Sequence, residues 1–129
     1  MTSSITVYIV DEDESVRNAM TRLMRSARFR AVGVSSIEEL LKQNLPANGA
    51  VIIADVNTAR RFAETLPEEL HEQNRSLPVI YLTDYDTEWI RGEAKRVGAA
   101  GYFRKPVDEQ ALVDAIEFAV QHTTAEQTV

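Results

Sequence analysis

Residues 5–13 read ITVYIVDED, an apolar and β-branched run that changes abruptly into acids. A short run that is apolar almost throughout is typical of a strand in a parallel sheet covered on both faces. The acids at 11–14 predict a loop, and Asp13 is a candidate N-cap for the following helix. Apolar residues then recur at helical spacing as far as Ala27. This stretch therefore predicts a strand, a loop and a helix.

The same unit recurs along the chain. Further strands are predicted at 30–34, 50–54, 78–83 and 101–104, and further helices at 36–42, 58–73 (broken near Pro67), 86–97 and 108–121. Five strands alternating with five helices predict a parallel sheet with right-handed crossovers. The expected fold class is α/β: a flavodoxin-like, doubly wound (βα)5 three-layer sandwich, with a five-stranded parallel sheet in the order 2-1-3-4-5.

Length and composition limit the classes of protein to consider. The 129 residues fit one domain, which we place at 1–122, with 123–129 as a frayed tail or the start of a linker. A formal net charge of −6 argues against nucleic-acid binding by this segment. Cysteine is absent, which excludes disulfides and thiolate chemistry. No apolar run approaches the roughly 20 residues that span a bilayer, so we expect no membrane segment and a cytoplasmic location.

Polar residues capable of chemistry stand where four of the predicted strands end. Asp11 and Glu12 follow the first strand, Asp55 ends the third, Thr83 ends the fourth, and Lys105 follows the fifth. In a doubly wound sheet, ligands bind at the carboxyl ends of the strands, near the point where the strand order reverses. We therefore expect the three carboxylates to converge there, with Thr83 and Lys105 beside them.

Three carboxylates in one pocket repel each other unless a cation neutralises them. Mg²⁺ suits such a pocket because it prefers oxygen ligands and keeps several waters. One carboxylate could attack a phosphoryl group and form an acyl phosphate. The metal, a lysine and a hydroxyl donor would then share the charge of the transferring group.

Four segments carry a family resemblance: VYIVDEDESVRNAM (7–20), VIIADVN (51–57), PVIYLT (78–83) and GAAGYFRKP (98–106). In this order and spacing they resemble the signature segments of response-regulator receiver domains of two-component signal transduction, over about residues 5–120. The first resembles receivers that precede a helix-turn-helix output domain. The resemblance implies a phosphoprotein of a bacterial phosphorelay that is no enzyme, beyond catalysing its own phosphorylation and dephosphorylation.

The resemblance also implies a metal site. Asp55 is similar to the phosphoacceptor. Glu12 falls where a direct metal ligand is expected, and Asp11 where a carboxylate reaches the metal through water. Asp55 and the backbone carbonyl of Asn57 would complete the protein ligands of Mg²⁺, for which Mn²⁺ could substitute.

Four further residues take roles from the resemblance. Lys105 would pair with the phosphoryl group, and Thr83 would donate a hydrogen bond to it. Tyr102 falls at the aromatic switch position and would turn inward when Thr83 moves toward the phosphate. The Lys105–Pro106 bond is expected to be cis, an isomer that only about 5–6% of X–Pro bonds adopt.

The sequence departs from the family pattern in three places. The segment 56–66 lacks the usual Met-Pro and following Gly, so Asn57 could present its carbonyl differently. Glu12 stands where Asp is commoner. Asp84 stands where a small residue is usual, and its bulk and charge predict slower phosphorylation by small donors and altered dephosphorylation. Asp84, Tyr85 and Asn57 are therefore expected to modulate the site.

The implied partners are a sensor histidine kinase and an output domain on a longer parent chain that would control transcription. A homodimer could form through the face made by the fourth helix, fifth strand and fifth helix. The kinase, the signal, the presence of an output domain and the oligomeric state are left open by the sequence.

Two other functions stay open at this point. One is a pseudo-receiver, an interaction module with the fold but without phosphorylation, which the 56–66 segment and Asp84 would favour. The other is a haloacid-dehalogenase-like phosphatase with Asp11 as nucleophile and Asp13 as acid. The absence of a further acidic pair at a strand end after Lys105 argues against the phosphatase.

Overall fold

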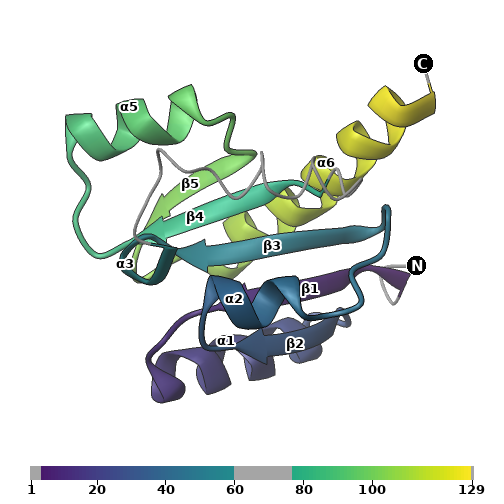
Figure 1. The fold of residues 1–129 in the computed structure, drawn as a ribbon, viewed down its shortest axis with the longest axis horizontal. Helices are drawn as coiled ribbons and strands as arrows, with labels where there is room; N and C mark the ends of the chain where they lie inside the picture. The colour runs from purple at the N-terminus through teal and green to yellow at the C-terminus, as the bar shows by residue number, and fades with distance from the viewer. Residues whose placement is uncertain (1–3, 60–76, 129) are drawn as a thin grey trace.

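A computed structural model describes residues 4–59 and 77–128 of the chain, with side chains up to residue 122. All strands of the sheet run parallel, in the order β2-β1-β3-β4-β5 (Figure 1). The strands are β1 (Thr6–Val10), β2 (Arg30–Val34), β3 (Ala50–Asp55), β4 (Val79–Thr83) and β5 (Gly101–Arg104). The predicted fold class and strand order are confirmed.

The central strands are buried on both faces. Every residue of β3 and of β4 is buried, which explains why these strands are apolar almost throughout instead of alternating. β5 lies at an edge of the sheet and is only partly buried. The register pairs Val10 of β1 with both Val34 and Ala54, so the residues that follow these strands start from the same level.

Helices connect the strands and begin at polar caps. They are α1 (Glu14–Ser26), α2 (Ile37–Leu41), α3 (Val56–Ala59), α5 (Glu88–Arg96) and α6 (Glu109–Thr128). The side chain of Asp13 accepts a hydrogen bond from the Val16 amide, and that of Ser36 from the Glu39 amide. The carboxylate of Asp108 does the same for Ala111 at the start of α6. The cap at Asp13 is the one predicted from the sequence, and the other two are of the same kind.

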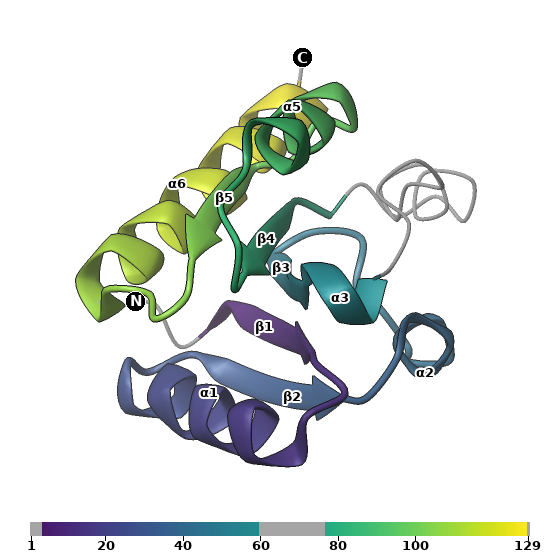
Figure 2. The same cartoon turned by 90° about the vertical axis from the view of Figure 1, so that its left-hand side faces the viewer.

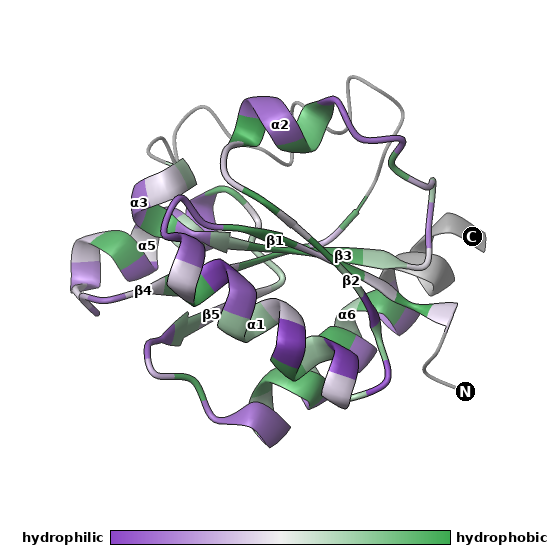
Figure 3. Ribbon diagram, turned by 90° about the horizontal axis from the view of Figure 1, so that it is seen from below, coloured by the Kyte–Doolittle hydropathy of each residue, from purple (hydrophilic) through white to green (hydrophobic). Residues whose placement is uncertain are grey.

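Two hydrophobic cores lie on opposite faces of the sheet. In Figure 3, α2 lies on one side of the mainly hydrophobic strands, and α1 and α6 lie on the other. One core joins Tyr8 and Tyr81 of the sheet to Leu40 of α2 and Ala94 of α5. The other joins strand residues to α1 and α6 through the buried side chains Met24, Leu112 and Ile116. The fold is thus the predicted three-layer sandwich.

Helix boundaries differ from the predictions by two residues or more in three places. α3 begins at Val56 instead of Thr58, because the Asp55 carboxylate caps it by accepting from the Thr58 amide. α5 begins at Glu88 instead of Asp86, because the Thr87 hydroxyl caps it by accepting from the Ile90 amide. α6 continues to Thr128, beyond the predicted end at Gln121, and no proline or glycine interrupts the sequence there. Most of the helix predicted at 58–73, with its break near Pro67, lies outside the described residues. No described helix is both long and apolar enough to cross a membrane.

We predict that Ile116→Ala destabilises the protein by about 2–5 kcal/mol, because the side chain is fully buried against the sheet. Phe118→Ala on the same helix is the matched control, since Phe118 is 60% exposed. Its cost should stay below about 1 kcal/mol. Urea unfolding of both variants measures the difference, and equal losses would contradict this placement of α6.

Candidate functional site

The polar residues singled out from the sequence gather where the parallel strands end. Figure 2 looks onto this edge of the sheet. Asp11 directly follows β1, Asp55 and Thr83 are the last residues of β3 and β4, and Lys105 directly follows β5. Asp11, Asp55 and Thr83 are the buried polar residues of the described core, at 5%, 6% and 3% exposure. Burying polar groups is costly unless they are paired, so their partners define the site.

Lys105 joins two of the buried carboxylates. Its Nζ lies 2.6 Å from Oδ1 of Asp55 and 3.2 Å from Oδ2 of Asp11, as a hydrogen bond and an ion pair to each. Burial disfavours the ammonium, but the hydrogen bonds and charges of Asp55 and Asp11 outweigh it and raise the pKa of Lys105. Lys105 therefore stays charged and holds the ends of β1, β3 and β5 together.

Charge in this site is not balanced. One ammonium faces two carboxylates, and burial strengthens the repulsion that is left between the carboxylates. Two buried groups with hard oxygen donors and an excess negative charge fit a divalent cation such as Mg²⁺. Within residues 4–59 and 77–128, no three acidic, histidine or cysteine side chains are grouped closely enough to hold a metal ion. Mg²⁺ commonly needs only one or two protein carboxylates, because it keeps several of its waters.

The remaining predicted metal ligands lie at the rim. Glu12 and Asn57 are both exposed, Glu12 in the loop after β1 and Asn57 in α3. The predicted convergence of three carboxylates is therefore wrong for the described residues: Asp11 and Asp55 meet at Lys105, and no third acidic side chain groups with them closely enough to hold a metal ion. Oδ1 of Asp11 accepts a hydrogen bond from the Asp13 amide at 2.9 Å, which fixes the carboxylate at the start of the loop. The metal-ligand roles of Glu12 and Asn57 stay predictions.

Thr58 is a site residue that the sequence analysis missed. Its amide and its hydroxyl both donate to Oδ2 of Asp55, at 2.9 and 3.0 Å. The same hydroxyl accepts from the Glu12 amide at 3.0 Å and so connects the loop after β1 to the end of β3. The available signal was the spacing Asp55-x-x-Thr58 at a helix start, where a carboxylate commonly caps the amide three residues later.

Arg17 was also missed. Its Nη1 donates to the backbone carbonyl of Asp11 at 2.9 Å, so α1 holds the residue that bears the buried carboxylate. Gly33 of β2 leaves room for this side chain, since a Cβ there would lie 2.9 Å from Cγ of Arg17. A glycine inside a strand is a known sign of such a close approach.

Thr83 is buried with its hydroxyl engaged. Oγ1 donates to the Tyr85 carbonyl at 3.0 Å and accepts from the Tyr85 amide at 3.1 Å. Asp84 and Tyr85 are both exposed, Tyr85 at 72%. Two of the three residues expected to modulate the site therefore lie exposed in the loop that Thr83 anchors, and their modulating role stays a prediction.

Tyr102 and the Lys105–Pro106 bond complete the predicted set. The Lys105–Pro106 bond is cis, the expected isomer. Tyr102 is partly buried, and its hydroxyl donates to Oδ1 of Asp86 at 3.1 Å. Burial and the neighbouring Asp86 carboxylate raise the pKa of Tyr102. Tyr102 is the register partner of Tyr81 in the β4–β5 ladder and packs against the core that contains Tyr81. Its switch role stays a prediction.

Comparisons with known proteins agree on the family. The model described as "Response regulator receiver domain" matches residues 7–117. The transcriptional regulatory protein TdiR of Thauera aromatica is 28% identical over 115 residues, which are 89% of this chain and 51% of TdiR. The chain thus spans about half the length of such a curated relative.

Solved structures show the same fold. The response regulator StyR superposes with a TM-score of 0.81 and 28% identity, over 97% of this chain and 63% of StyR. The structure titled FixJ-N superposes with a TM-score of 0.79 and 25% identity, over 92% of this chain and 94% of that one. Each of these proteins is similar to this chain across the strand ends that carry the site.

We predict that Thr58→Val speeds hydrogen exchange of the Glu12 amide and lowers the free energy of unfolding by about 0.5–1.5 kcal/mol, because both hydrogen bonds of the hydroxyl are lost. Thr58→Ser keeps the hydroxyl and is the matched control. Amide exchange followed by NMR measures the effect. An unchanged Glu12 amide in Thr58→Val would show that the hydroxyl does not connect the two loops.

Proposed function

The chain belongs to the response regulator receiver domain family, and we propose that it accepts a phosphoryl group on Asp55 from a sensor histidine kinase. One observation supports this assignment most: Lys105 holds the buried Asp55 carboxylate at 2.6 Å, at the strand ends where ligands bind in this fold. Receiver domains are in general regulatory modules, so phosphorylation would change what the protein binds.

The proposed reaction is a phosphoryl transfer to a carboxylate. An oxygen of Asp55 attacks the phosphorus of phosphohistidine, the P–N bond breaks, and its electron pair leaves with the imidazole of the kinase. The product is an acyl phosphate on Asp55. Negative charge spreads over the transferring group, and Lys105 is already placed to stabilise it.

The other residues of the site position the nucleophile. Thr58 and Lys105 hold one oxygen of Asp55 each, so the carboxylate is oriented before the donor arrives. Receiver domains generally bind Mg²⁺ at their acidic site, where the cation offsets the charge of the carboxylates and the phosphoryl oxygens. Asp11 and Asp55 would hold it here, with Glu12 and the Asn57 carbonyl at the rim, and Mn²⁺ could replace it.

The parent protein is proposed from its relatives. TdiR is a transcriptional regulatory protein about twice as long as the matched region, so we propose that an output domain acting on transcription follows residues 1–122. The proposed site of action is the cytoplasm. A homodimer through α5, β5 and α6 is proposed as the form in which the phosphorylated protein would reach its output.

The structure and the family match bear differently on the two alternative functions, the phosphatase and the pseudo-receiver. Asp13, the acid of the phosphatase alternative, caps α1 with its carboxylate, and the family match also favours a receiver. A pseudo-receiver would keep the fold without accepting phosphate. The buried pairing of Asp55 with Lys105 favours a working phosphoacceptor, because it retains the two groups on which the reaction depends.

We predict one added phosphoryl group on the wild-type protein after incubation with acetyl phosphate and Mg²⁺, and none on Asp55→Asn. Intact-mass analysis measures the adduct, and Asp108→Asn is the control for loss of a carboxylate elsewhere. An adduct that persists in Asp55→Asn would show that the phosphoacceptor is another residue. No adduct on any protein, together with a flat Mg²⁺ titration, would favour the pseudo-receiver.

We predict that Asp84→Ala speeds phosphorylation by acetyl phosphate about two- to fivefold, because an exposed negative charge beside the site repels an anionic donor. The rate of adduct formation, measured by quenched mass analysis, tests this. Glu88→Gln removes an exposed charge farther along the chain and should change the rate less. Equal rates for Asp84→Ala and the wild type would contradict a modulating role.

A further inference from the structure

A second polar cluster lies outside the proposed phosphoryl site, which consists of Asp11, Asp55, Thr83 and Lys105. Oδ1 of Asp86 accepts from the Tyr102 hydroxyl at 3.1 Å and from Nε of Arg91 at 2.9 Å. The three residues come from three segments: the loop after β4, helix α5 and strand β5. Asp86, predicted from the sequence as the first residue of a helix, lies in the loop before α5.

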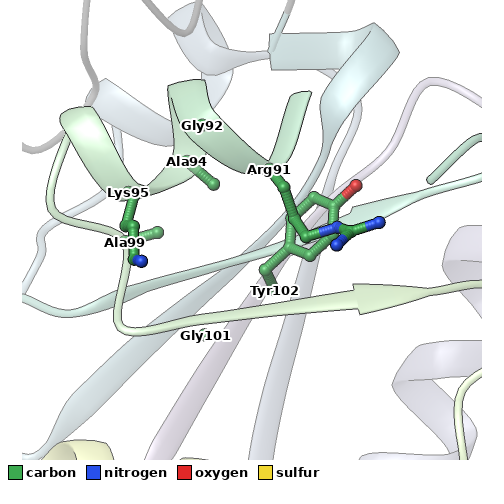
Figure 4. Close-up of a pocket in the computed structure, with 7 residues that line it drawn as sticks. All are labelled: Arg91, Gly92, Ala94, Lys95, Ala99, Gly101 and Tyr102. Carbon is green, nitrogen blue, oxygen red and sulfur yellow. The ribbon is translucent and has the colours of Figure 1, made fainter. Parts of the chain in front are cut away.

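Two members of this cluster, Arg91 and Tyr102, line one end of a pocket between α5 and β5 with a volume of about 420 Å³. Figure 4 shows Arg91 and Tyr102 at that end of the pocket, with Lys95 and Ala99 at the other. The Tyr102 ring is thus a wall of the pocket. Moving the ring would change the shape of the surface that α5 and β5 present.

The cluster is connected to the phosphoryl site through one turn of backbone. The Thr83 hydroxyl donates its one hydrogen to the Tyr85 carbonyl, and Tyr85 directly precedes Asp86. Thr83 cannot donate to a phosphoryl oxygen while it donates to this carbonyl. When the hydroxyl turns to another acceptor, the Tyr85 carbonyl loses its donor, and the loop that carries Asp86 loses an anchor.

The sheet register places Thr83 and Tyr102 on the same face of the sheet. Tyr102 pairs with Tyr81, which lies two residues before Thr83, so by strand alternation Thr83 points to the side of the sheet on which Tyr102 packs. We propose that Asp86 is a positioning residue that holds Tyr102 at the pocket wall until Thr83 releases the loop between them. This proposal rests on the proposed function, because the phosphoryl group on Asp55 is the acceptor that would draw Thr83 away.

The protonation states in the cluster allow the hydrogen bond between Tyr102 and Asp86 to form and to break. The hydrogen bond from Arg91 lowers the pKa of Asp86, so the carboxylate remains an acceptor at neutral pH. Burial and Asp86 raise the pKa of Tyr102, so the phenol keeps the hydrogen that it donates. The Arg91–Asp86 pair is partly exposed, and exposed ion pairs are weak enough for a change of one hydrogen bond to shift their population.

The first test uses the unphosphorylated protein labelled with 3-fluorotyrosine. The ¹⁹F resonance of Tyr102 is identified by its loss in Tyr102→Phe. We expect this resonance to shift in Asp86→Ala and to stay in place in Glu88→Gln, which removes a charge two residues away. An unshifted Tyr102 resonance in Asp86→Ala would overturn the proposal.

The second test asks whether Thr83 acts through Asp86. Thr83→Val should shift the Tyr102 resonance in the same direction as Asp86→Ala, and the double variant should show no further shift. Thr83→Ser keeps the hydroxyl and should resemble the wild type, which separates loss of the hydrogen bond from a change in packing. Additive shifts, or no shift in Thr83→Val, would show that the two residues act independently.

The last test adds acetyl phosphate and Mg²⁺, with the adduct checked by intact mass. The wild-type Tyr102 resonance should move on phosphorylation, and in Asp86→Ala it should move much less. Equal movement in both proteins would overturn the positioning role. If no adduct forms, the proposed function fails instead, and the first two tests still decide whether Asp86 couples Thr83 to Tyr102.

Discussion

The ion pairs of Lys105 with Asp55 and Asp11 are the interaction on which the arrangement of the strand ends depends. They connect residues 50 and 94 positions apart in the chain. Because unpaired charges are costly to bury, three strand ends must reach the same level before these groups can leave water. The parallel register satisfies this requirement, and α1 supports it by holding the Asp11 carbonyl through Arg17. The fold and the chemistry of the site therefore both require that the ends of β1, β3 and β5 meet at the same level.

Asp55 stands in an asymmetric environment. One of its oxygens faces an ammonium, and the other faces the amide and hydroxyl of Thr58 at the start of α3. A carboxylate held on both sides has little freedom left to lose when a reaction partner arrives. The segment after Asp55 departs from the usual family pattern, yet it supplies these contacts through Thr58. The Asp55 carboxylate is therefore oriented in this chain despite the departure from the pattern.

Hydrophobic periodicity and capping residues predicted the fold well. They could not predict hydrogen bonds between side chains that are distant in the sequence. The strands at 30–34 and 101–104 were predicted to the residue, because short β-branched or aromatic runs stand between turn residues. The caps at Asp13, Ser36 and Asp108 follow from short-range hydrogen bonding. The set Asp11, Asp55, Thr83 and Lys105 could be predicted because sheet topology brings strand ends together. Thr58 had a local signal, its spacing of three from Asp55, but its contact with the Glu12 amide leaves no periodic trace in the sequence. The hydrogen bond between Asp86 and Tyr102 leaves none either, since it joins a loop to a strand.

The two cores on opposite faces of the sheet allow the two layers of the molecule to rearrange independently. Tyr102 packs on the face that α2 and α5 cover, whereas α1 and α6 cover the other face around Ile9, Met24 and Ile116. Packed cores have discrete arrangements, so one layer can be rearranged while the other stays rigid. We expect mutations of the buried side chains in the α1–α6 layer to lower the abundance of the protein, and mutations of the partly exposed residues on the opposite layer, such as Tyr102, to alter the proposed signalling. In a family of such chains, the two faces would drift under different selection.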